Sequence, residues 1–210
     1  MNFFDCASAP SPRLVRIFLA EKNLKASVLN VDLRSGEHLR PEFKLINPYC
    51  TVPVIEVEEN GTRFTSTQGC WRYLEGLKPE PALLGETALE KGIIGDLVWR
   101  MEMDGMQAVA EGLRNSSPKL KDRAMVGPDN VKQIPDLGVR GKTRAAKFLD
   151  QLENILEEKR YFAGERFSGA DIMALVVIDF AGWLKLSLPK EAKNVQRWFK
   201  DVSARPSAQL

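Results

Sequence analysis

The sequence has few of the residues that build disulfide frameworks and metal centres. It holds three cysteines and one histidine among its 210 residues. Cys6, Cys50 and Cys70 lie at unrelated spacings without a C-x-x-C pair, and His38 has no second histidine beside it. This set argues against a disulfide scaffold and against a structural metal site. With 44% hydrophobic residues, the chain can instead bury a core without crosslinks.

An excess of one charge is also missing. The chain has 30 Lys and Arg residues and 28 Asp and Glu residues, which gives a formal net charge of +2. No basic run is interleaved with aromatic residues in the way that would follow a phosphate backbone. We therefore expect no nucleic-acid partner.

Long hydrophobic runs are absent as well. Residues 1–6 lack the basic region and the apolar stretch of a secretory signal. The most apolar segment, residues 172–188, contains Asp179 and Lys185 and follows a helix cap, so it is interpreted as a buried core helix. We expect a cytoplasmic protein without a membrane partner.

The first 78 residues alternate between strand-like and helix-like segments. A short apolar strand at residues 3–6 is followed by a loop and then by apolar residues at helical spacing from Leu14 onward. Ser11 before Pro12 is typical of an N-cap with proline at the first helical position. A second β-rich run covers residues 27–33. This order predicts a β-α-β unit whose two strands pair in parallel.

A hairpin and a further helix complete this part. Asn60-Gly61 is a turn signal between residues 54–57 and 63–65, which predicts two antiparallel strands. A short helical piece precedes them at residues 41–45. After the hairpin, Ser66 and Thr67 can cap a helix, and the proline-containing segment 76–81 is interpreted as a linker.

From Thr87 onward the pattern is helical only. Residues 116–142 are rich in Ser, Pro, Gly, Lys and Asp and predict a long loop or a broken helix that borders a binding cleft. An apolar stripe predicts a helix over residues 145–156. Ser168 and Asp171 form a capping box, from which we expect about 1 kcal/mol of stability and no chemistry.

Together these segments resemble the cytosolic glutathione S-transferases over nearly the whole chain, and most of all the bacterial and fungal branch that lacks the catalytic tyrosine. The resemblance implies an α/β thioredoxin-like N-terminal domain, residues 1–78, followed by an all-α C-terminal domain, residues 86–210. The matching motifs are Ser8 to Ile17, Gly36-Glu37-His38, Glu42-Phe43, Asn47-Pro48 through Val52-Pro53-Val54, Phe167 to Ile172, and Trp198 with Arg205-Pro206.

The resemblance also implies where glutathione binds. Thr51, Val52 and Pro53 match the cis-proline loop, where Val52 pairs with the cysteinyl backbone as an added strand does. Ser66 and Thr67 lie at a helix start, which suits the γ-glutamyl carboxylate. His38 and Arg40 match the position that reaches the glycine carboxylate.

Catalysis requires a thiolate, whereas a free thiol has a pKa of roughly 8.5. Ser11 is the first candidate to ionise the sulfur, together with the positive end of its helix, and Ser8 is the second. In the most direct alignment, the serine of the serine-type branches falls on Ala9. Backbone N–H groups, or a water held by residues 114–117, therefore stay open as alternatives.

The resemblance implies a detoxifying transferase that conjugates glutathione, its co-substrate, to small apolar electrophiles, with no metal. It also implies a homodimer, which the Met- and Trp-rich segment 99–106 favours. Two alternatives remain. Ser66, where the family usually has Glu or Gln, favours a non-catalytic or regulatory glutathione-binding module. Cys6 and Cys50 favour a glutathione-dependent thiol reductase or peroxidase.

Overall fold

The computed structural model describes residues 1–210 and divides them into two compact units. The first comprises Met1–Pro81 together with Val126–Asp129 and Leu210. The second comprises Ala82–Met125 and Asn130–Gln209. The first unit is α/β and the second is helical, which is the fold class that the sequence predicts.

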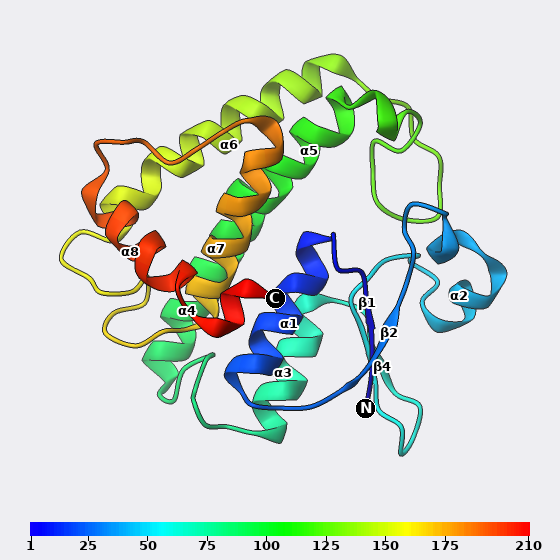
Figure 1. Cartoon of the computed structure of the whole chain (residues 1–210), viewed down its shortest axis with the longest axis horizontal. Coiled ribbons are helices and arrows are strands. Elements are labelled where there is room, and N and C mark those ends of the chain that lie inside the picture. The colour runs from blue at the N-terminus through cyan, green and yellow to red at the C-terminus, as the bar shows by residue number, and fades with distance from the viewer. The chain divides into compact units, whose positions relative to one another are not determined.

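A four-stranded mixed sheet forms the centre of the first unit (Figure 1). The strand order is β2-β1-β3-β4, with β1 parallel to β2 and antiparallel to β3, and β3 antiparallel to β4. The predicted β-α-β unit and hairpin are thereby confirmed. The strands are β1 (Asn2–Asp5), β2 (Ser27–Asn30), β3 (Val54–Glu56) and β4 (Arg63–Phe64).

Helices α1 (Pro10–Glu21) and α3 (Thr67–Leu77) pack against each other beside the strands (Figure 1). Phe18 stacks on Trp71 with ring centroids 5.1 Å apart, and the Trp71 indole N–H donates to the Leu14 carbonyl at 3.1 Å. This bond satisfies a polar group inside an otherwise apolar contact.

A second apolar cluster forms around Phe43 of α2 (Pro41–Ile46), which follows the single turn η1 (Glu37–Leu39). Phe43 packs edge-on against Phe4 of β1, with ring centroids 6.2 Å apart. Because side chains alternate along a strand, Phe3 of β1 points away from Phe4. Both are buried, so the sheet carries apolar packing on its two faces.

The predicted linker after α3 is held by a buried lysine. Lys22, at the end of α1, is fully buried and forms a 2.5 Å ion pair with Glu75. Its ammonium also donates to the carbonyls of Lys78 and Pro79, each at 2.9 Å, and to that of Pro81. All of its donors are therefore used, as a buried charge requires.

The second unit is made of helices connected by loops and single turns, as the sequence predicts. A π-helical segment, η2, joins two of the α-helices. The α-helices are α4 (Ala88–Arg100), α5 (Gln107–Ser116), α6 (Pro135–Ile155), α7 (Gly169–Ala181) and α8 (Lys193–Ser203), and the shorter segments are η2 (Met101–Met106), η3 (Pro118–Leu120), η4 (Gly182–Leu184) and η5 (Pro206–Gln209).

Helix α6 begins earlier than the sequence predicts. The expected loop or broken helix over residues 116–142 is wrong beyond Ile134, because α6 starts at Pro135 and includes Gly138 and Gly141. These glycines are buried against α5: a Cβ on Gly141 would lie 2.3 Å from the Gly112 nitrogen. They therefore permit close helix packing, although glycine usually weakens a helix.

Helix α7 is the buried core helix that its composition predicts, although it ends at Ala181. Ser168 and Asp171 form the predicted capping box at its start. Asp171 also accepts from the Trp198 indole N–H at 2.7 Å, and burial raises the pKa of this carboxyl group. None of the helices in residues 1–210 has both the length and the apolarity to span a bilayer.

Candidate active site

The strand register brings four chain segments together at one end of the strands, which is called the convergent edge of the sheet. The parallel strands β1 and β2 end together at Asp5 and Asn30, and antiparallel β3 begins at Val54, opposite Phe4. Strand β4 ends beside the start of β3. The loop after β1, the turn after β2, the loop before β3 and the start of α3 therefore meet at the same edge.

The loop between β1 and α1 is held by an arginine. Arg16 of α1 forms an ion pair with the buried carboxylate of Asp5 and donates to the carbonyls of Ala7 at 3.0 Å and Cys6 at 3.4 Å. The Ala9 N–H adds a 2.9 Å bond to the Cys6 carbonyl. The start of α1 thus has a fixed position relative to the end of β1.

Ser11 does not cap α1. Its N-cap is Ala9, the helix begins at Pro10, and no side chain caps it, so the predicted cap is wrong by two residues. Pro10 meets the same requirement as Pro12, since a first-turn proline needs no N–H partner. Ser11 lies half-buried in the first turn.

The two prolines change what the helix start can offer to an anion. A helix normally leaves its first four N–H groups without intrahelical partners. Here Pro10 and Pro12 have no N–H, and the Ala9 N–H is bonded to Cys6. Among these four positions, only Ser11 keeps an N–H for a ligand, and its hydroxyl lies in the same turn. Ser8 is exposed on the preceding loop.

The loop before β3 is organised by the buried Asn47. Its side-chain amide donates to the carbonyl of Thr51 at 2.8 Å and to the Thr51 hydroxyl at 3.0 Å, and its oxygen accepts from the Tyr49 N–H at 3.0 Å. Residue Cys50 adopts a φ of 54° within this turn. The Val52–Pro53 peptide bond that follows is cis, as the sequence predicts.

Val52 leaves its backbone polar groups available. Its side chain is buried in the cluster that includes Phe4, Phe43 and Val54, with Cys6 packed against the same cluster. None of the chain's backbone hydrogen bonds uses its N–H or its carbonyl, because pairing between β1 and β3 stops at Val54. An extended peptide can pair with such a residue.

Ser66 and Thr67 lie at the start of α3. Ser66 is the N-cap, and its hydroxyl oxygen accepts from the Gly69 N–H at 3.1 Å. Thr67 is the first helical residue, so its N–H points out of the helix with the positive end of the dipole. The Ser66 oxygen is engaged in capping, whereas Thr67 can serve an anionic ligand.

His38 and Arg40 follow a tight turn after β2. The Asp32 carboxylate accepts from the Ser35 and Arg34 N–H groups, and these bonds lower the pKa of Asp32. The turn leads into η1, where His38 is half-buried, and Arg40 is exposed at the start of α2.

The three cysteines differ in their surroundings. Cys6 is half-buried, and its sulfur lies 3.5 Å from the Ser8 hydroxyl. Cys50 is buried, with its sulfur 3.7 Å from the Pro48 carbonyl. Burial raises the pKa of the Cys70 thiol to about 12, which makes a Cys70 thiolate unfavourable at neutral pH.

The segment 114–117 lies in the second unit, and its side chains are engaged there. Arg114 donates to the carbonyl of Arg123 at 2.7 Å, Asn115 donates to that of Glu111 at 3.0 Å, and Ser116 donates to that of Gly112 at 2.7 Å. These contacts stabilise α5 and the loop after it.

Sequence patterns did not reveal the residues that support this edge. Asp5 and Arg16 are eleven residues apart, so only the pairing of β1 with α1 joins them. Asn47 had a signal, because Asn and Asp side chains commonly bond the backbone two residues later in turns. The Asn47-Pro48 motif can be recognised in the sequence, whereas the burial of Asn47 and its hydrogen bonds to the loop before β3 cannot.

Comparisons with known proteins agree with this fold. The family model described as the glutathione S-transferase N-terminal domain matches residues 10–77, and that of the C-terminal domain matches residues 126–206. The chain belongs to the glutathione S-transferase family. It is a transferase, and enzymes of this family use glutathione as a substrate.

Several relatives resemble the chain over its full length. Glutathione S-transferase 2 of Saccharomyces cerevisiae is 34% identical over 210 residues, which cover 99% of this chain and 87% of the yeast protein. The crystal structure of Gtt2 from the same yeast has a TM-score of 0.90 at 32% identity and covers 100% of this chain and 99% of its own.

Bacterial structures extend the likeness. A glutathione S-transferase domain-containing protein from Marinobacter aquaeolei has a TM-score of 0.90 at 33% identity, with 99% of both chains covered. A Sulfitobacter homologue with bound glutathione has a TM-score of 0.81 at 19% identity, covering 99% of this chain and 94% of its own, which shows a shared fold.

Proposed function

We propose that this enzyme conjugates glutathione, through its thiolate, to small apolar electrophiles and binds the tripeptide along the convergent edge of its sheet. The observation that carries the proposal is the unused backbone N–H and carbonyl of Val52, next to Pro53 and Thr51. The cysteinyl backbone of glutathione would pair with Val52. The ends of the tripeptide would reach Thr67, supported by Ser66, and the His38–Arg40 turn.

The sulfur would lie at the start of α1. There the Ser11 hydroxyl and N–H donate to the thiolate, with Ser8 as a second hydroxyl nearby, and the helix dipole favours the negative charge. The thiol proton leaves to solvent. The thiolate then attacks the electrophilic carbon, a C–S bond forms, and the leaving group departs with its electron pair.

Two measurements on the wild-type protein test this proposal. We expect retention on glutathione-agarose and steady conjugation of an aryl chloride such as 1-chloro-2,4-dinitrobenzene. Chloride release should match the thioether formed in equal amounts. A protein that binds glutathione and conjugates no aryl, benzyl or alkyl halide would contradict the proposal and favour the non-catalytic glutathione-binding module.

A glutathione-dependent thiol reductase is the second candidate, because Cys6 packs against the cluster that holds Val52 and its sulfur is half-buried beside Ser8. In that reaction the Cys6 thiolate attacks a disulfide, forms a mixed disulfide and releases one thiol. Glutathione then attacks the substrate sulfur of the mixed disulfide and releases the Cys6 thiolate, and a second glutathione displaces the remaining substrate thiol to give glutathione disulfide. Reduction of hydroxyethyl disulfide that disappears in Cys6→Ser would support it.

We also propose a homodimer, with a second copy of the chain covering one side of α4. That side exposes Leu89, Gly92, Gly95 and Trp99, at spacings of three and four residues, and Met103 of η2 follows. Apart from adjacent residues and the backbone of α4 itself, no atom of the chain lies within 4 Å of a Cβ built on either glycine. An apolar face without intramolecular cover, in which small residues permit close approach, suits a second helix.

A further inference from the structure

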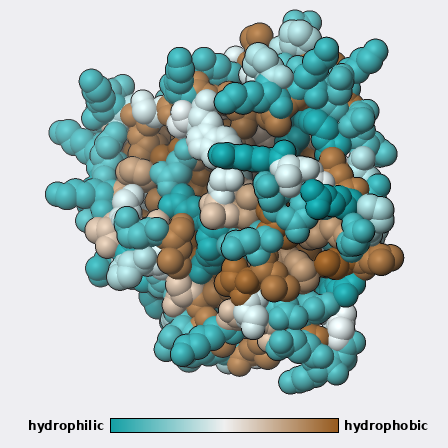
Figure 2. All heavy atoms as spheres, turned by 45° about the vertical axis from the view of Figure 1, so that its right-hand side comes forward, coloured by the Kyte–Doolittle hydropathy of each residue, from teal (hydrophilic) through white to brown (hydrophobic).

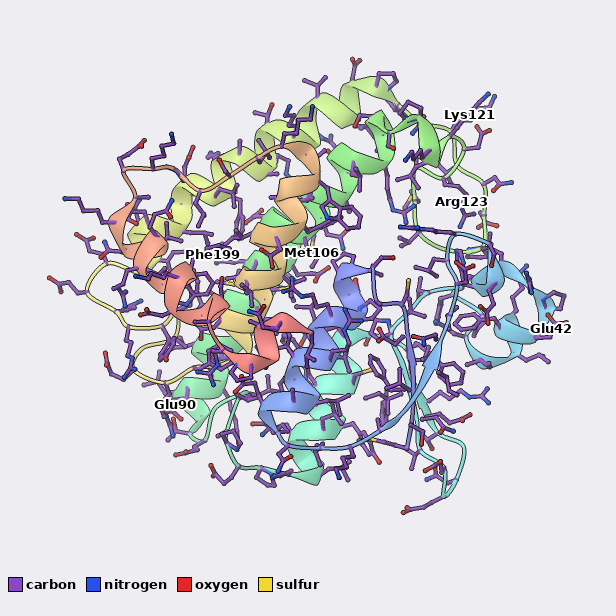
Figure 3. The ribbon with its side chains drawn as sticks, viewed as in Figure 1. Glu42, Glu90, Met106, Lys121, Arg123 and Phe199 are labelled. Carbon is purple, nitrogen blue, oxygen red and sulfur yellow. The ribbon has the colours of Figure 1, made fainter.

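The chain turns sharply between β1 and α1. The Ala9 N–H donates to the Cys6 carbonyl at 2.9 Å, which closes a four-residue turn with Ala7 and Ser8 at its corners. Neither corner residue has a positive φ, so the turn accepts ordinary residues and suits a proline at its first corner. Figure 1 shows this bend between β1 and α1, and Figure 3 shows the side chains around it.

Arg16 holds the turn from one side. Its guanidinium pairs with the buried carboxylate of Asp5 at 2.5 Å and donates to the carbonyls of Cys6 at 3.4 Å and Ala7 at 3.0 Å. Only 15% of the Arg16 side chain is exposed. Three consecutive residues at the end of β1 are therefore bound to one rigid, planar group.

This arrangement decides where two backbone N–H groups point. Both peptide bonds at the corners of the turn are trans, and in a trans peptide unit the N–H points opposite to the carbonyl. Because the carbonyls of Cys6 and Ala7 face Arg16, the N–H groups of Ala7 and Ser8 face away from it. None of the chain's backbone hydrogen bonds uses either N–H, and both residues are exposed. Successive N–H groups of this kind form a concave site, or nest, for an anion.

We propose that the N–H groups of Ala7 and Ser8 donate to the thiolate of bound glutathione, and that Arg16 is the residue that positions them. The proposal rests on the proposed conjugation reaction, which places the sulfur at the adjacent start of α1. The thiol proton leaves to solvent, and the two N–H groups stabilise the remaining charge together with Ser11. Figure 2 shows hydrophilic and hydrophobic residues intermixed on the face that it draws, and backbone donors leave no mark in such a colouring.

Ala7→Pro tests the donors directly, because proline suits the first corner of the turn and removes only the N–H of that residue. We expect the pKa of the bound glutathione thiol to rise by about one unit, the size of one charge-assisted hydrogen bond. Ultraviolet absorbance of the bound thiolate across pH measures this pKa without any electrophile. The affinity for S-methylglutathione, which forms no thiolate, should stay the same. Ala7→Val keeps the N–H and should match the wild-type protein.

Arg16→Lys tests the positioning role, because lysine keeps a positive charge beside Asp5 but lacks the planar fork that reaches the two carbonyls. We expect the thiol pKa to rise by about one unit here as well. Arg63→Lys is the matched control. Arg63 also joins a carboxylate, that of Glu56 at 2.7 Å, to a carbonyl, that of Leu45 at 2.7 Å, but at the other end of β3. It should leave the thiol pKa unchanged.

Melting temperatures check that each variant is folded. If Ala7→Pro has the thiol pKa of Ala7→Val while the wild-type protein conjugates an aryl chloride, the N–H donors are wrong and the proposed reaction stands. A folded Arg16→Lys protein with the wild-type thiol pKa would overturn the positioning role, whether or not Ala7→Pro folds. If the wild-type protein binds glutathione without lowering its thiol pKa and conjugates nothing, both proposals are wrong.

Discussion

Lys22 combines full burial with a charged ammonium group whose donors are all used. Replacing it with methionine keeps much of the volume but leaves Glu75 and the carbonyls of Pro79 and Pro81 without their partner. We expect Lys22→Met to lower the free energy of unfolding by about 3 to 5 kcal/mol, as the loss of one member of a buried charged network does.

Urea unfolding followed by circular dichroism measures this change. Lys25→Met is the control, because Lys25 is exposed three residues away and should change stability by less than about 0.5 kcal/mol. Equal midpoints for the two variants would show that the buried ammonium adds nothing to the stability of the first unit.

Ser11 is the residue on which the proposed chemistry depends most. Removing its hydroxyl leaves its N–H in place, so we expect Ser11→Ala to raise the pKa of bound glutathione by about one unit, the size of one charge-assisted hydrogen bond. Conjugation at pH 6.5 should fall about tenfold and recover as pH rises.

The pH dependence of kcat/KM measures this shift, with Ser8→Ala as the comparison. A pH profile that moves in Ser8→Ala and not in Ser11→Ala would assign the hydroxyl to Ser8. If neither pH profile shifts, the backbone N–H of Ser11 or a water molecule stabilises the glutathione thiolate instead.

Glycine residues set how closely α5 and α6 approach each other. A Cβ on Gly141 would lie 2.3 Å from the Gly112 nitrogen and 2.8 Å from the Ala108 carbonyl oxygen, both of them backbone atoms. We expect Gly141→Ala to cost about 2 to 3 kcal/mol of stability, because the two helices must move apart.

Denaturant unfolding of Gly141→Ala against Gly76→Ala tests this prediction. Gly76 lies in α3 with no atom within 4 Å of an added Cβ, so alanine there should stabilise by about 0.5 kcal/mol through helix propensity. A stabilising Gly141→Ala would mean that the helices can move apart freely.

The start of α4 carries a pH-dependent cap. Glu90 accepts from the Glu86 and Thr87 N–H groups and pairs with Arg166, and these contacts lower the pKa of Glu90 from 4.5 to about 2. A lowered folded-state pKa gives stability that is present above pH 4.5 and is lost as pH falls toward 2.

We therefore expect Glu90→Gln to melt at a lower temperature than the wild-type protein at pH 7, with the difference shrinking between pH 4.5 and 2. Thermal unfolding at a series of pH values measures it, and Glu157→Gln, at an exposed residue after α6, should show no difference. A difference that persists unchanged at pH 2 would mean that packing, and not charge, is responsible.

Local patterns were enough to predict most of these elements. The Asn60-Gly61 turn, the Ser168–Asp171 box and the apolar stripe of α6 each follow from nearby residues. The start of α6 could not be predicted in this way. Gly138 and Gly141 allow α6 to pack closely against α5, and a local sequence pattern does not contain this contact. The start of α1 was misplaced because Pro10 and Pro12 both suit a first turn.

The exposed face of α4 predicts that two copies of the chain associate. Trp99 is 58% exposed on that face. If a second copy covers it, Trp99→Asp should weaken the dimer at least about 30-fold, as the loss of a central tryptophan does in other interfaces. Light scattering over a range of protein concentrations measures the change.

Trp183→Asp is the matched control, since Trp183 is 55% exposed on η4, away from α4. It should leave the dimer intact. A wild-type protein with the mass of one chain at micromolar concentration would overturn the proposed dimer directly.

The candidate site could be predicted only where its parts are local in sequence. Val52-Pro53 and the Ser66–Thr67 helix start follow from motifs of a few residues, and the structure places both at one sheet edge. The contact of Gly127 with the turn at Tyr49 joins residues almost eighty positions apart. Only the folded chain reveals such a contact, because neither segment has a pattern that names the other.

The convergence of four segments at one edge leaves the opposite edge of the sheet free for other uses. The Asn60-Gly61 turn lies there, at the far ends of β3 and β4, and both residues are exposed. A fluorophore or a surface linker attached at Asn60 would sit a strand's length from Val52. The enzyme could thus be immobilised through this hairpin with its tripeptide edge open to solution.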